Sequence, residues 1–547
     1  MELQQNIWTV RISTRNNVSP RNFIPPFSLR VWRDCCFVVL MAMVVVDCSS
    51  SQPTEFVVRS NDTLRLGNKP FYFLGANAYY LLEQTSRGDT TTVKALFATA
   101  NSLKMNVVRT WGFFDSSDSL NPAVVQYRPG VFNERALRAL DYVLYQAKLH
   151  NIRLLIPLVN SWDDYGGMNQ YVRWRSQITT ATEKPTQRFS PSDQARIIEG
   201  GNGRSYRFAM TSQLGHDDFY ADAIIKSWYK NYIYVILNRM NTFTNVRYKD
   251  EPSIFGWELA NEPRSSDVSS RLFYNWATAI SSYIKSLDQN HLVGTGEEGF
   301  DDSETGYSVN SYNNQHWLFD GSGGVAFSVN SVIPSIDFGS CHLYPESWNV
   351  TKSAGNVWIR DHIRIAQGMK KPLIVGEFGV REQKLATYDS WMTTALLDGA
   401  AGAMVWQVLE GPRTDGEGFG FRCSQEQQLC SRLRDIATRF INKSQSGSLP
   451  APQSFSLRQN YPNPFNGVTT IAYSLPFDAC VDLSVFNALG QKVTTVVEGA
   501  QSAGERKELL EGEALASGSY FYRLRVSALS QPLRKYYSET KKLSLLK

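Results

Sequence analysis

The feature that most constrains the fold is an alternation of short apolar runs with helical patterns through the middle of the chain. Alternation of this kind predicts a parallel sheet, and eight units over about 380 residues predict a closed (β/α)₈ TIM barrel with long loops. A doubly wound open sheet is the structural alternative, but no GxGxxG or Walker pattern follows any run. The eight runs cover 71–80, 106–113, 153–160, 254–262, 292–298, 337–344, 372–378 and 403–409.

The fourth run ends in a carboxylate at the position where barrel enzymes carry their chemistry. Residues 254–263 read IFGWELANEP, in which Ile, Phe and Trp favour a strand and Pro263 prevents its continuation inside a sheet. Glu262 therefore follows the carboxyl end of a buried strand, which is the catalytic end of a parallel barrel. The seventh run, PLIVGEFG at 372–379, has the same design and ends at Glu377.

Composition narrows the class of protein. The 547 residues exceed one ordinary domain, and a hydrophobic content of 42% is typical of a globular chain. The net charge of +5 comes from 56 basic and 51 acidic residues spread along the chain, which gives no support to nucleic-acid binding. An aromatic content of 12% favours a sugar ligand, because sugar C–H faces stack on aromatic rings. With six His and no HExxH, HxH or CxxC pattern, we predict no metal and no cofactor.

Residues 1–52 are predicted to be an N-terminal extension with a signal peptide. Arg30 and Arg33 precede CCFVVLMAMVVV, an apolar core of about twelve residues that is too short to span a membrane. Cys48 makes a lipoprotein the alternative, but Asp47 stands where a small residue is expected, so we favour ordinary cleavage. The mature protein is then expected outside the cell, with no membrane span.

A change of pattern divides the rest of the chain. The Ser-, Gly- and Pro-rich segment 442–453 is predicted to be a linker that ends a barrel of residues 53–441. At 454–547, alternating runs with Gly-containing turns predict a small all-β sandwich. Cys423 and Cys430 are close enough in sequence to close a small loop in an oxidising compartment, and the sequence leaves open whether they pair.

Polar and aromatic residues stand at the ends of all eight runs, so a barrel would gather them at one mouth. Two carboxylates there can hydrolyse a glycosidic bond, because one protonates the leaving oxygen and the other attacks or activates water. A separation of about 5 to 5.5 Å makes the second a nucleophile and retains the anomeric configuration. In run order the residues are Asn77; Arg109 and Trp111; Asn160 and Trp162; Asn261 and Glu262; Glu297 and Glu298; His342 and Tyr344; Glu377; Trp406 and Gln407.

The residues around the seventh strand end have physical roles in such a site. Arg109 is predicted to lower the pKa of Glu377 and keep it ionised. Tyr344 can donate to the same carboxylate, and His342 can extend the network. Glu297 and Glu298 are rival carboxylates, which could bind sugar hydroxyls or replace Glu377.

The residues around the fourth strand end are assigned in the same way. Asn261 is placed to bind the sugar 2-OH, a contact that strengthens in the transition state. Glu262 must stay protonated near neutrality, and we expect Trp257 and Trp406 to supply the partly desolvated setting that this requires. Trp406 could also form the floor beneath the reacting sugar.

Residues 56–440 resemble glycoside hydrolase family 5, and within it the endo-β-1,4-mannanases. The resemblance implies that Glu262 is the acid/base and Glu377 the nucleophile. It also implies binding or supporting roles for Trp111, Asn261, Tyr344, Trp406, Arg109 and His342, to which we add Asn77 and Trp162 from the first and third strand ends. The similar stretches are GANAYYL, VVRTWGF, NSWDDYGGMNQYVRW, YKNYIYVILNR, YKDEPSIFGWELANEPR, TGEEGF, DFGSCHLYPESW, VGEFG and VWQ.

The motifs differ in what they specify. NEP and GEFG are shared with cellulases of the same clan, so they indicate the mechanism and not the substrate. WDDYGGMNQYV and TGEEGF are more specific and favour mannan. An insert at about 178–207 departs from the family pattern and could reshape the cleft.

The C-terminal part resembles the type IX secretion sorting domain of Bacteroidetes-like bacteria. The stretches that carry the resemblance are NYPNPFN, VFNALGQKV, LASGSYFYRL and the terminal KKLSLLK. Such a domain is recognised by the secretion machinery, so it implies export and adds no chemistry. A generic sandwich or a carbohydrate-binding module is the alternative, which the lack of an exposed-aromatic pattern disfavours.

These patterns together predict a secreted, monomeric, retaining endo-β-1,4-mannanase. Its substrates would be the internal β-1,4-mannosidic bonds of mannan, glucomannan and galactomannan. One alternative is a β-1,4-glucanase of the same clan, and another is a non-catalytic glycan-binding protein on a barrel scaffold.

Overall fold

The computed structural model describes residues 52–182, 214–447, 449–529 and 535–547. The predicted N-terminal extension, the signal peptide and Cys48 lie outside these residues, as does most of the insert expected at 178–207. Within the described residues, none of the helices combines the length and the apolar character that a membrane span requires.

Eight parallel strands form one sheet in the order β10-β9-β8-β5-β4-β13-β12-β11, and a parallel bridge between Gly294 and Phe338 joins its two ends. The predicted barrel is therefore confirmed, and each apolar run contains or overlaps one strand. Most strands are shorter than the runs that contain them. Their bounds are β4 (Phe73–Asn77), β5 (Val107–Arg109), β8 (Arg153–Pro157), β9 (Ile254–Glu258), β10 (Leu292–Gly294), β11 (Gly339–Leu343), β12 (Leu373–Phe378) and β13 (Gly402–Val405).

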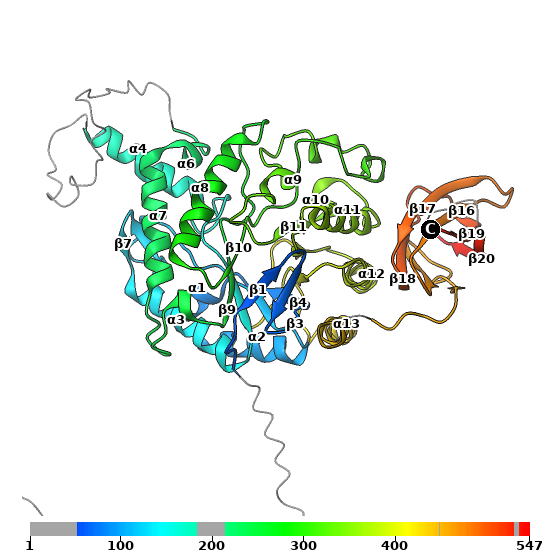
Figure 1. Ribbon diagram of the computed structural model, residues 1–547, viewed down its shortest axis with the longest axis horizontal. Coiled ribbons are helices and arrows are strands. Elements are labelled where there is room, and N and C mark those ends of the chain that lie inside the picture. The colour runs from blue at the N-terminus through cyan, green and yellow to red at the C-terminus, as the bar shows by residue number, and fades with distance from the viewer. Residues whose placement is uncertain (1–51, 183–213, 448, 530–534) are drawn as a thin grey trace, which may run out of the picture. The chain divides into compact units, whose positions relative to one another are not determined.

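Helices surround the strands on the outside of the barrel (Figure 1). In α3, for example, Asn133 caps the first turn and the apolar residues face the sheet at helical spacing. The helices are α1 (Leu81–Ser86), α2 (Thr90–Ser102), α3 (Glu134–Leu149), α4 (Gly167–Thr182), α6 (Asp218–Ala221), α7 (Ala223–Asn238), α8 (Arg271–Leu287), α9 (Phe327–Asn330), α10 (Pro345–Trp348), α11 (Ala354–Gly368), α12 (Lys384–Asp398) and α13 (Gln427–Ser446), with 3₁₀ turns η1 (Tyr248–Asp250), η2 (Val309–Ser311) and η3 (His316–Leu318).

Two helical segments end or begin at informative positions. Helices α6 and α7 meet at Asp222, whose side chain accepts from the backbone N–H groups of Ile224 and Ile225 and so begins a new helix. Helix α13 continues to Ser446, into the segment predicted as the start of the linker.

A short hairpin that the sequence analysis missed closes the N-terminal end of the barrel. Strands β1 (Val57–Ser60), β2 (Thr63–Leu66) and β3 (Lys69–Pro70) form an antiparallel sheet. Val57 and Leu64 from this hairpin belong to a buried apolar cluster. The cluster also contains residues from seven of the eight barrel strands, and Phe338, which lies just before the eighth strand, β11. This end of the barrel interior is therefore apolar, and the polar side chains are left to the carboxyl ends of the strands.

The C-terminal part contains two antiparallel sheets that share one apolar core. In β16 and β19, buried residues alternate with more exposed ones, as a half-buried strand requires. The first sheet contains β14 (Ser456–Leu457), β15 (Val468–Leu475) and β18 (Gly504–Glu511). The second contains β17 (Lys492–Gln501), β16 (Ala479–Phe486), β19 (Gly518–Ser527) and β20 (Lys535–Leu545). A separate small hairpin of β6 (Gln126–Arg128) and β7 (Val131–Phe132) belongs to the barrel part.

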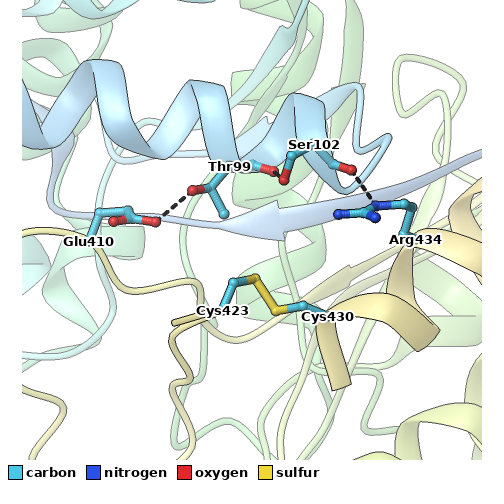
Figure 2. Close-up of a disulfide and its surroundings, with 6 residues drawn as sticks. All are labelled: Thr99, Ser102, Glu410, Cys423, Cys430 and Arg434. Carbon is cyan, nitrogen blue, oxygen red and sulfur yellow. Dashed lines mark hydrogen bonds between the residues drawn. A yellow bond between two sulfur atoms is a disulfide. The ribbon is translucent and has the colours of Figure 1, made fainter. Parts of the chain in front are cut away.

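Cys423 and Cys430, whose pairing the sequence left open, form a disulfide with a Cα–Cα distance of 5.6 Å. Figure 2 shows the disulfide between two contacts that reach α2. Thr99 Oγ1 donates to Glu410 at 2.6 Å, and Arg434 Nε donates to the carbonyl oxygen of Ser102 at 2.6 Å. The disulfide therefore fastens the loop after β13 to α13 between these two contacts.

Replacing both cysteines by serine is expected to lower the free energy of unfolding of the barrel by about 2 to 3 kcal/mol, since the cross-link restricts the unfolded chain. Urea denaturation with and without a reductant measures the effect. The wild type should lose stability on reduction, whereas the double serine variant should be insensitive to the reductant. Equal stability of the oxidised wild type and the variant would contradict the prediction.

Candidate active site

A buried arginine connects four strand ends at the carboxyl end of the barrel. Arg109, the last residue of β5, donates from Nε to Glu258 Oε2 at 2.7 Å and from Nη2 to Asn261 Oδ1 at 2.8 Å. Its Nη1 donates to Asn77 Oδ1 at 3.3 Å and to Glu377 Oε1. One guanidinium group thus holds side chains from β4, β9, the segment after β9, and β12.

Glu258 is the member of this cluster that the sequence analysis missed. It is the last residue of β9 and is fully buried, and it forms an ion pair with Arg109. The signal was present in GWELANEP, where a charged residue interrupts an apolar strand. Because side chains alternate along a strand, Glu258 points to the same side as Gly256 and opposite to Trp257.

Glu377, on β12, is held by donors on both oxygens. Arg109 donates to Oε1, and Tyr344 Oη donates to Oε2 at 2.6 Å. Burial raises the pKa of Glu377 to about 6, while His342, Arg109 and the Tyr344 hydroxyl oppose this rise. The predicted effect of Arg109, which lowers the pKa of Glu377, is therefore present, but desolvation outweighs it and the net shift is upward.

Glu262 has a different set of partners. Trp162 Nε1 donates to Oε2 at 2.7 Å, and His342 Nδ1 shares a hydrogen bond of 2.7 Å with Oε1. Burial raises the pKa of Glu262, and the indole donor, Arg264 and Arg109 oppose the rise. The backbone of Glu262 is in the left-handed region with φ 47°, and its N–H donates to the carbonyl oxygen of Gly296 at 2.9 Å.

The two carboxylates are close together, with His342 between them. One oxygen of Glu262, one oxygen of Glu377 and one ring nitrogen of His342 all lie within 4.8 Å of one another. His342 Nδ1 is 3.7 Å from Glu377 Oε2, and burial lowers the pKa of His342, so its imidazole is neutral near pH 7. Hydrogen bonds within the protein account for this closeness without an ion.

Aromatic rings form a wall at the same mouth. Tyr79 stacks on Trp406 with ring centroids 5.3 Å apart and an interplanar angle of 4°. Trp111 contacts Tyr79 at 4.7 Å, and Tyr165 contacts Trp111 edge-on at 5.1 Å. The predicted Trp111 and Trp406 thus belong to one cluster, to which the structure adds Tyr79 and Tyr165. Both added tyrosines lie in motifs quoted above, GANAYYL and WDDYGG, but no spacing distinguished them.

Two sequence expectations need correction or refinement. Trp257 does not desolvate Glu262, because its indole points away from the barrel interior and donates to Asp288 at 2.8 Å. Glu297 is buried apart from the two carboxylates, where it accepts from Thr295 Oγ1 at 2.9 Å and Asn330 Nδ2 at 3.0 Å. Burial raises the pKa of Glu297 to about 8, so it is protonated at neutral pH.

Two further polar residues of the predicted set, Asn160 and Asn77, extend the cluster. Asn160 accepts from Asn261 Nδ2 at 3.0 Å, so the Asn261 amide is held on both sides. Asn77 Nδ2 donates to the carbonyl oxygen of Gly376 at 2.9 Å, next to Glu377. A cleft beside the Glu262 contacts is lined by Ser161, Trp162, Asp163, Asn169, His216, Asp217, Arg264, Ser265 and Ser266.

Comparison with known proteins identifies the family of this barrel. Residues 54–417 match the family model described as GH family 5 beta-mannosidase-like. The chain belongs to this family. A putative mannan endo-1,4-beta-mannosidase 4 of Arabidopsis thaliana is 35% identical over 402 residues, which cover 68% of this glycoside hydrolase and 89% of the relative. Mannan endo-1,4-beta-mannosidase 4 of Solanum lycopersicum is 35% identical over 357 residues, covering 62% and 78%.

Solved structures agree with this assignment. The endo-beta-1,4-mannanase from Thermotoga petrophila has a TM-score of 0.61 and 27% identity, covering 88% of this glycoside hydrolase and 99% of that chain. The endo-1,4-beta-mannanase from Rhizomucor miehei has a TM-score of 0.58 and 34% identity, covering 71% and 100%. Residues 459–535 match the model of a secretion system C-terminal sorting domain, which indicates export to the cell surface or beyond.

Removal of the Glu258 carboxylate is expected to destabilise this glycoside hydrolase by about 3 to 5 kcal/mol, because Glu258→Ala leaves part of the Arg109 charge buried without its partner. Chemical denaturation measures the change. The matched control is Glu134→Ala, which removes an exposed partner of Arg239 and should cost less than about 1 kcal/mol. Similar losses in the two variants would contradict the role of the buried ion pair.

The acid side of the pH–activity profile should reflect Glu377. A nucleophilic or basic carboxylate must be ionised, so activity should fall as the pH drops through about 6, the pKa of Glu377. Tyr344→Phe removes a hydrogen bond that favours the ionised form, which raises this pKa and moves the acid limb of kcat/KM to higher pH. A limb that stays in place, or moves to lower pH, would show that Tyr344 does not stabilise the carboxylate.

Proposed function

We propose that the protein is a secreted, retaining endo-β-1,4-mannanase that hydrolyses internal bonds of mannan, glucomannan and galactomannan. The observation that carries this proposal is the pair of carboxylates formed by the partly buried Glu262 and the buried Glu377, whose nearer oxygens lie within 4.8 Å. A pair this close leaves no room for a water molecule to attack between the carboxylate and the sugar, so one carboxylate attacks directly. Similar proteins named as a mannan endo-1,4-beta-mannosidase and an endo-beta-1,4-mannanase support mannan as the polysaccharide.

In the first step Glu377 attacks the anomeric carbon, and the bond from that carbon to the leaving oxygen breaks. Glu262 gives its proton to this oxygen, so the leaving sugar departs as an alcohol and Glu377 becomes a glycosyl ester. In the second step Glu262, now ionised, takes a proton from water, and the hydroxide oxygen attacks the same carbon. The ester bond breaks, Glu377 regains its charge and Glu262 its proton.

The surrounding residues have distinct roles in these steps. Arg109 and Tyr344 hold Glu377 in position and stabilise its charge before attack. Asn261 is the proposed partner of the sugar 2-OH, although its amide is occupied by Arg109 and Asn160 before substrate arrives. Trp406 and Trp111 are the proposed stacking platforms for the glycone.

The rest of the chain serves export in this proposal. Residues 1–52 would hold the signal peptide, 53–441 the catalytic domain, 442–453 the linker and 454–547 the sorting domain, and the enzyme would act as a monomer. The secretion machinery is then the protein partner, with the sorting domain as its recognition element. The disulfide between Cys423 and Cys430 supports an oxidising destination.

The decisive experiment follows hydrolysis of a linear manno-oligosaccharide by NMR, with the wild type, Glu262→Ala and Glu377→Ala. We expect the β-anomer to form first, and activity to fall by about 10³-fold or more in both variants, because each variant lacks one group that the reaction needs. An α-anomer as first product would reject the retaining mechanism. Parallel assays on cellulose-type glucan distinguish a glucanase, and inertness on both polymers would favour a glycan-binding protein.

A further inference from the structure

Beside the two proposed catalytic carboxylates lies a third buried carboxylate, Glu298, with no role in the steps above. It follows β10 and has only 4% of its surface exposed. Its two oxygens accept from Arg264 Nη2 at 2.7 Å and Arg264 Nε at 2.6 Å, which is the bidentate geometry of a tight ion pair. Glu298 therefore fixes both the position and the plane of the Arg264 guanidinium group.

Arg264 in turn lies between two aromatic rings. Its guanidinium carbon is 5.1 Å from the Trp162 ring centroid and 4.8 Å from that of Phe300. Trp162 is 43% exposed. The guanidinium group of Arg264 packs against the face of its indole ring. The orientation of the indole, and with it the 2.7 Å hydrogen bond from Nε1 to Glu262, thus depends on Arg264.

Glu298 is also linked to the other oxygen of Glu262, through His342. The backbone N–H of His342 donates to the carbonyl oxygen of Glu298 at 2.9 Å, and the His342 ring bonds Glu262 Oε1. Both hydrogen-bond partners of Glu262 are consequently anchored on one residue, one through its side chain and one through its main chain.

We propose that Glu298 is a positioning residue for the catalytic acid: through Arg264 and the Trp162 indole it determines how tightly Glu262 holds its proton. The inference rests on the proposed function, since it assigns Glu262 as the acid. The positive charge of Arg264 favours loss of that proton, and the negative charge of Glu298 offsets Arg264. The charged and titratable groups that face Glu262 are Arg109, Arg264, Glu298, His342, Tyr344, Glu377 and Glu417.

Substitutions of Glu298 and Arg264 are expected to shift the alkaline limb of kcat/KM in opposite directions. Glu298→Gln keeps one oxygen that accepts from Arg264, so the guanidinium and the indole stay in place, but it removes the counter-charge of Arg264. Glu262 should then lose its proton more readily, and the alkaline limb of kcat/KM should move to lower pH. Arg264→Gln removes the positive charge, so the limb should move to higher pH, as it should for Trp162→Phe, which lacks the indole donor. We expect each displacement to be about half a pH unit or more. A residue that merely supported the fold would not move the limb in opposite directions.

The test compares two substrates over the pH range, a manno-oligosaccharide and a 2,4-dinitrophenyl β-mannobioside. Dinitrophenolate leaves without a proton, so a defect in acid catalysis should appear on the oligosaccharide and be small on the aryl substrate. Glu297→Gln is the matched control, because this neighbouring buried carboxylate bonds Thr295 and Asn330 and should not move the limb. Thermal melting confirms that each variant is folded.

The outcomes separate this inference from the proposed function. A wild type that hydrolyses both substrates, with opposite limb displacements in Glu298→Gln and Arg264→Gln, supports it. Unmoved limbs, displacements in the same direction, or equal losses on the two substrates would overturn the positioning role and leave the mannanase proposal intact. A wild type inert on both substrates would reject the two together.

Discussion

The site depends on one buried positive charge that is shared among several strand ends. Taking a guanidinium group out of water is costly, and a barrel interior can accept it only where carboxylates and amide oxygens surround it. Arg109 meets that condition with Glu258, Glu377, Asn77 and Asn261. Because these partners come from different strands, the ion-pair network sets the relative positions of the strand ends as well as the charge of the site. Chemistry and architecture are therefore fixed by the same contacts.

Desolvation makes both reactive carboxylates weaker acids, and their partners then differentiate them. Glu377 accepts from Arg109 and from a tyrosine hydroxyl, which can only favour its ionised form. Glu262 has an indole donor on one oxygen and a neutral imidazole on the other, and an imidazole nitrogen can accept as well as donate. A proton on Glu262 therefore has a place in the hydrogen-bond network, whereas a proton on Glu377 would face two donors. The proposed assignment of Glu262 as the acid and Glu377 as the nucleophile rests on this difference.

The sequence was sufficient to predict the barrel, because eight apolar runs with periodic helical segments leave few other arrangements. It also identified the polar strand ends, since a parallel barrel brings them together whatever their separation along the chain. It could not give the direction of side chains, and this explains the errors: Trp257 belongs to the right strand but points to Asp288. Nor could it weigh burial against charge: Arg109 lowers the pKa of Glu377 as predicted, but burial raises it by more. The hairpin of β1 to β3 was missed because its strands are too short to show an alternating pattern. Glu258 was missed because a single charged residue within an apolar run forms no pattern of its own.

The left-handed backbone of Glu262 has an evolutionary consequence. A side chain with a Cβ atom in this region costs roughly 1 to 3 kcal/mol, and only Gly, Asn and Asp adopt it readily. Glutamate is thus a poor choice for folding at this position, and the proposed acid/base role gives a reason for its presence there. In a lineage released from selection for hydrolysis, drift at position 262 would favour glycine or asparagine, and the loss of activity would come with a more stable barrel. Descendants of this kind should be recognisable as intact scaffolds that bind glycans without cleaving them.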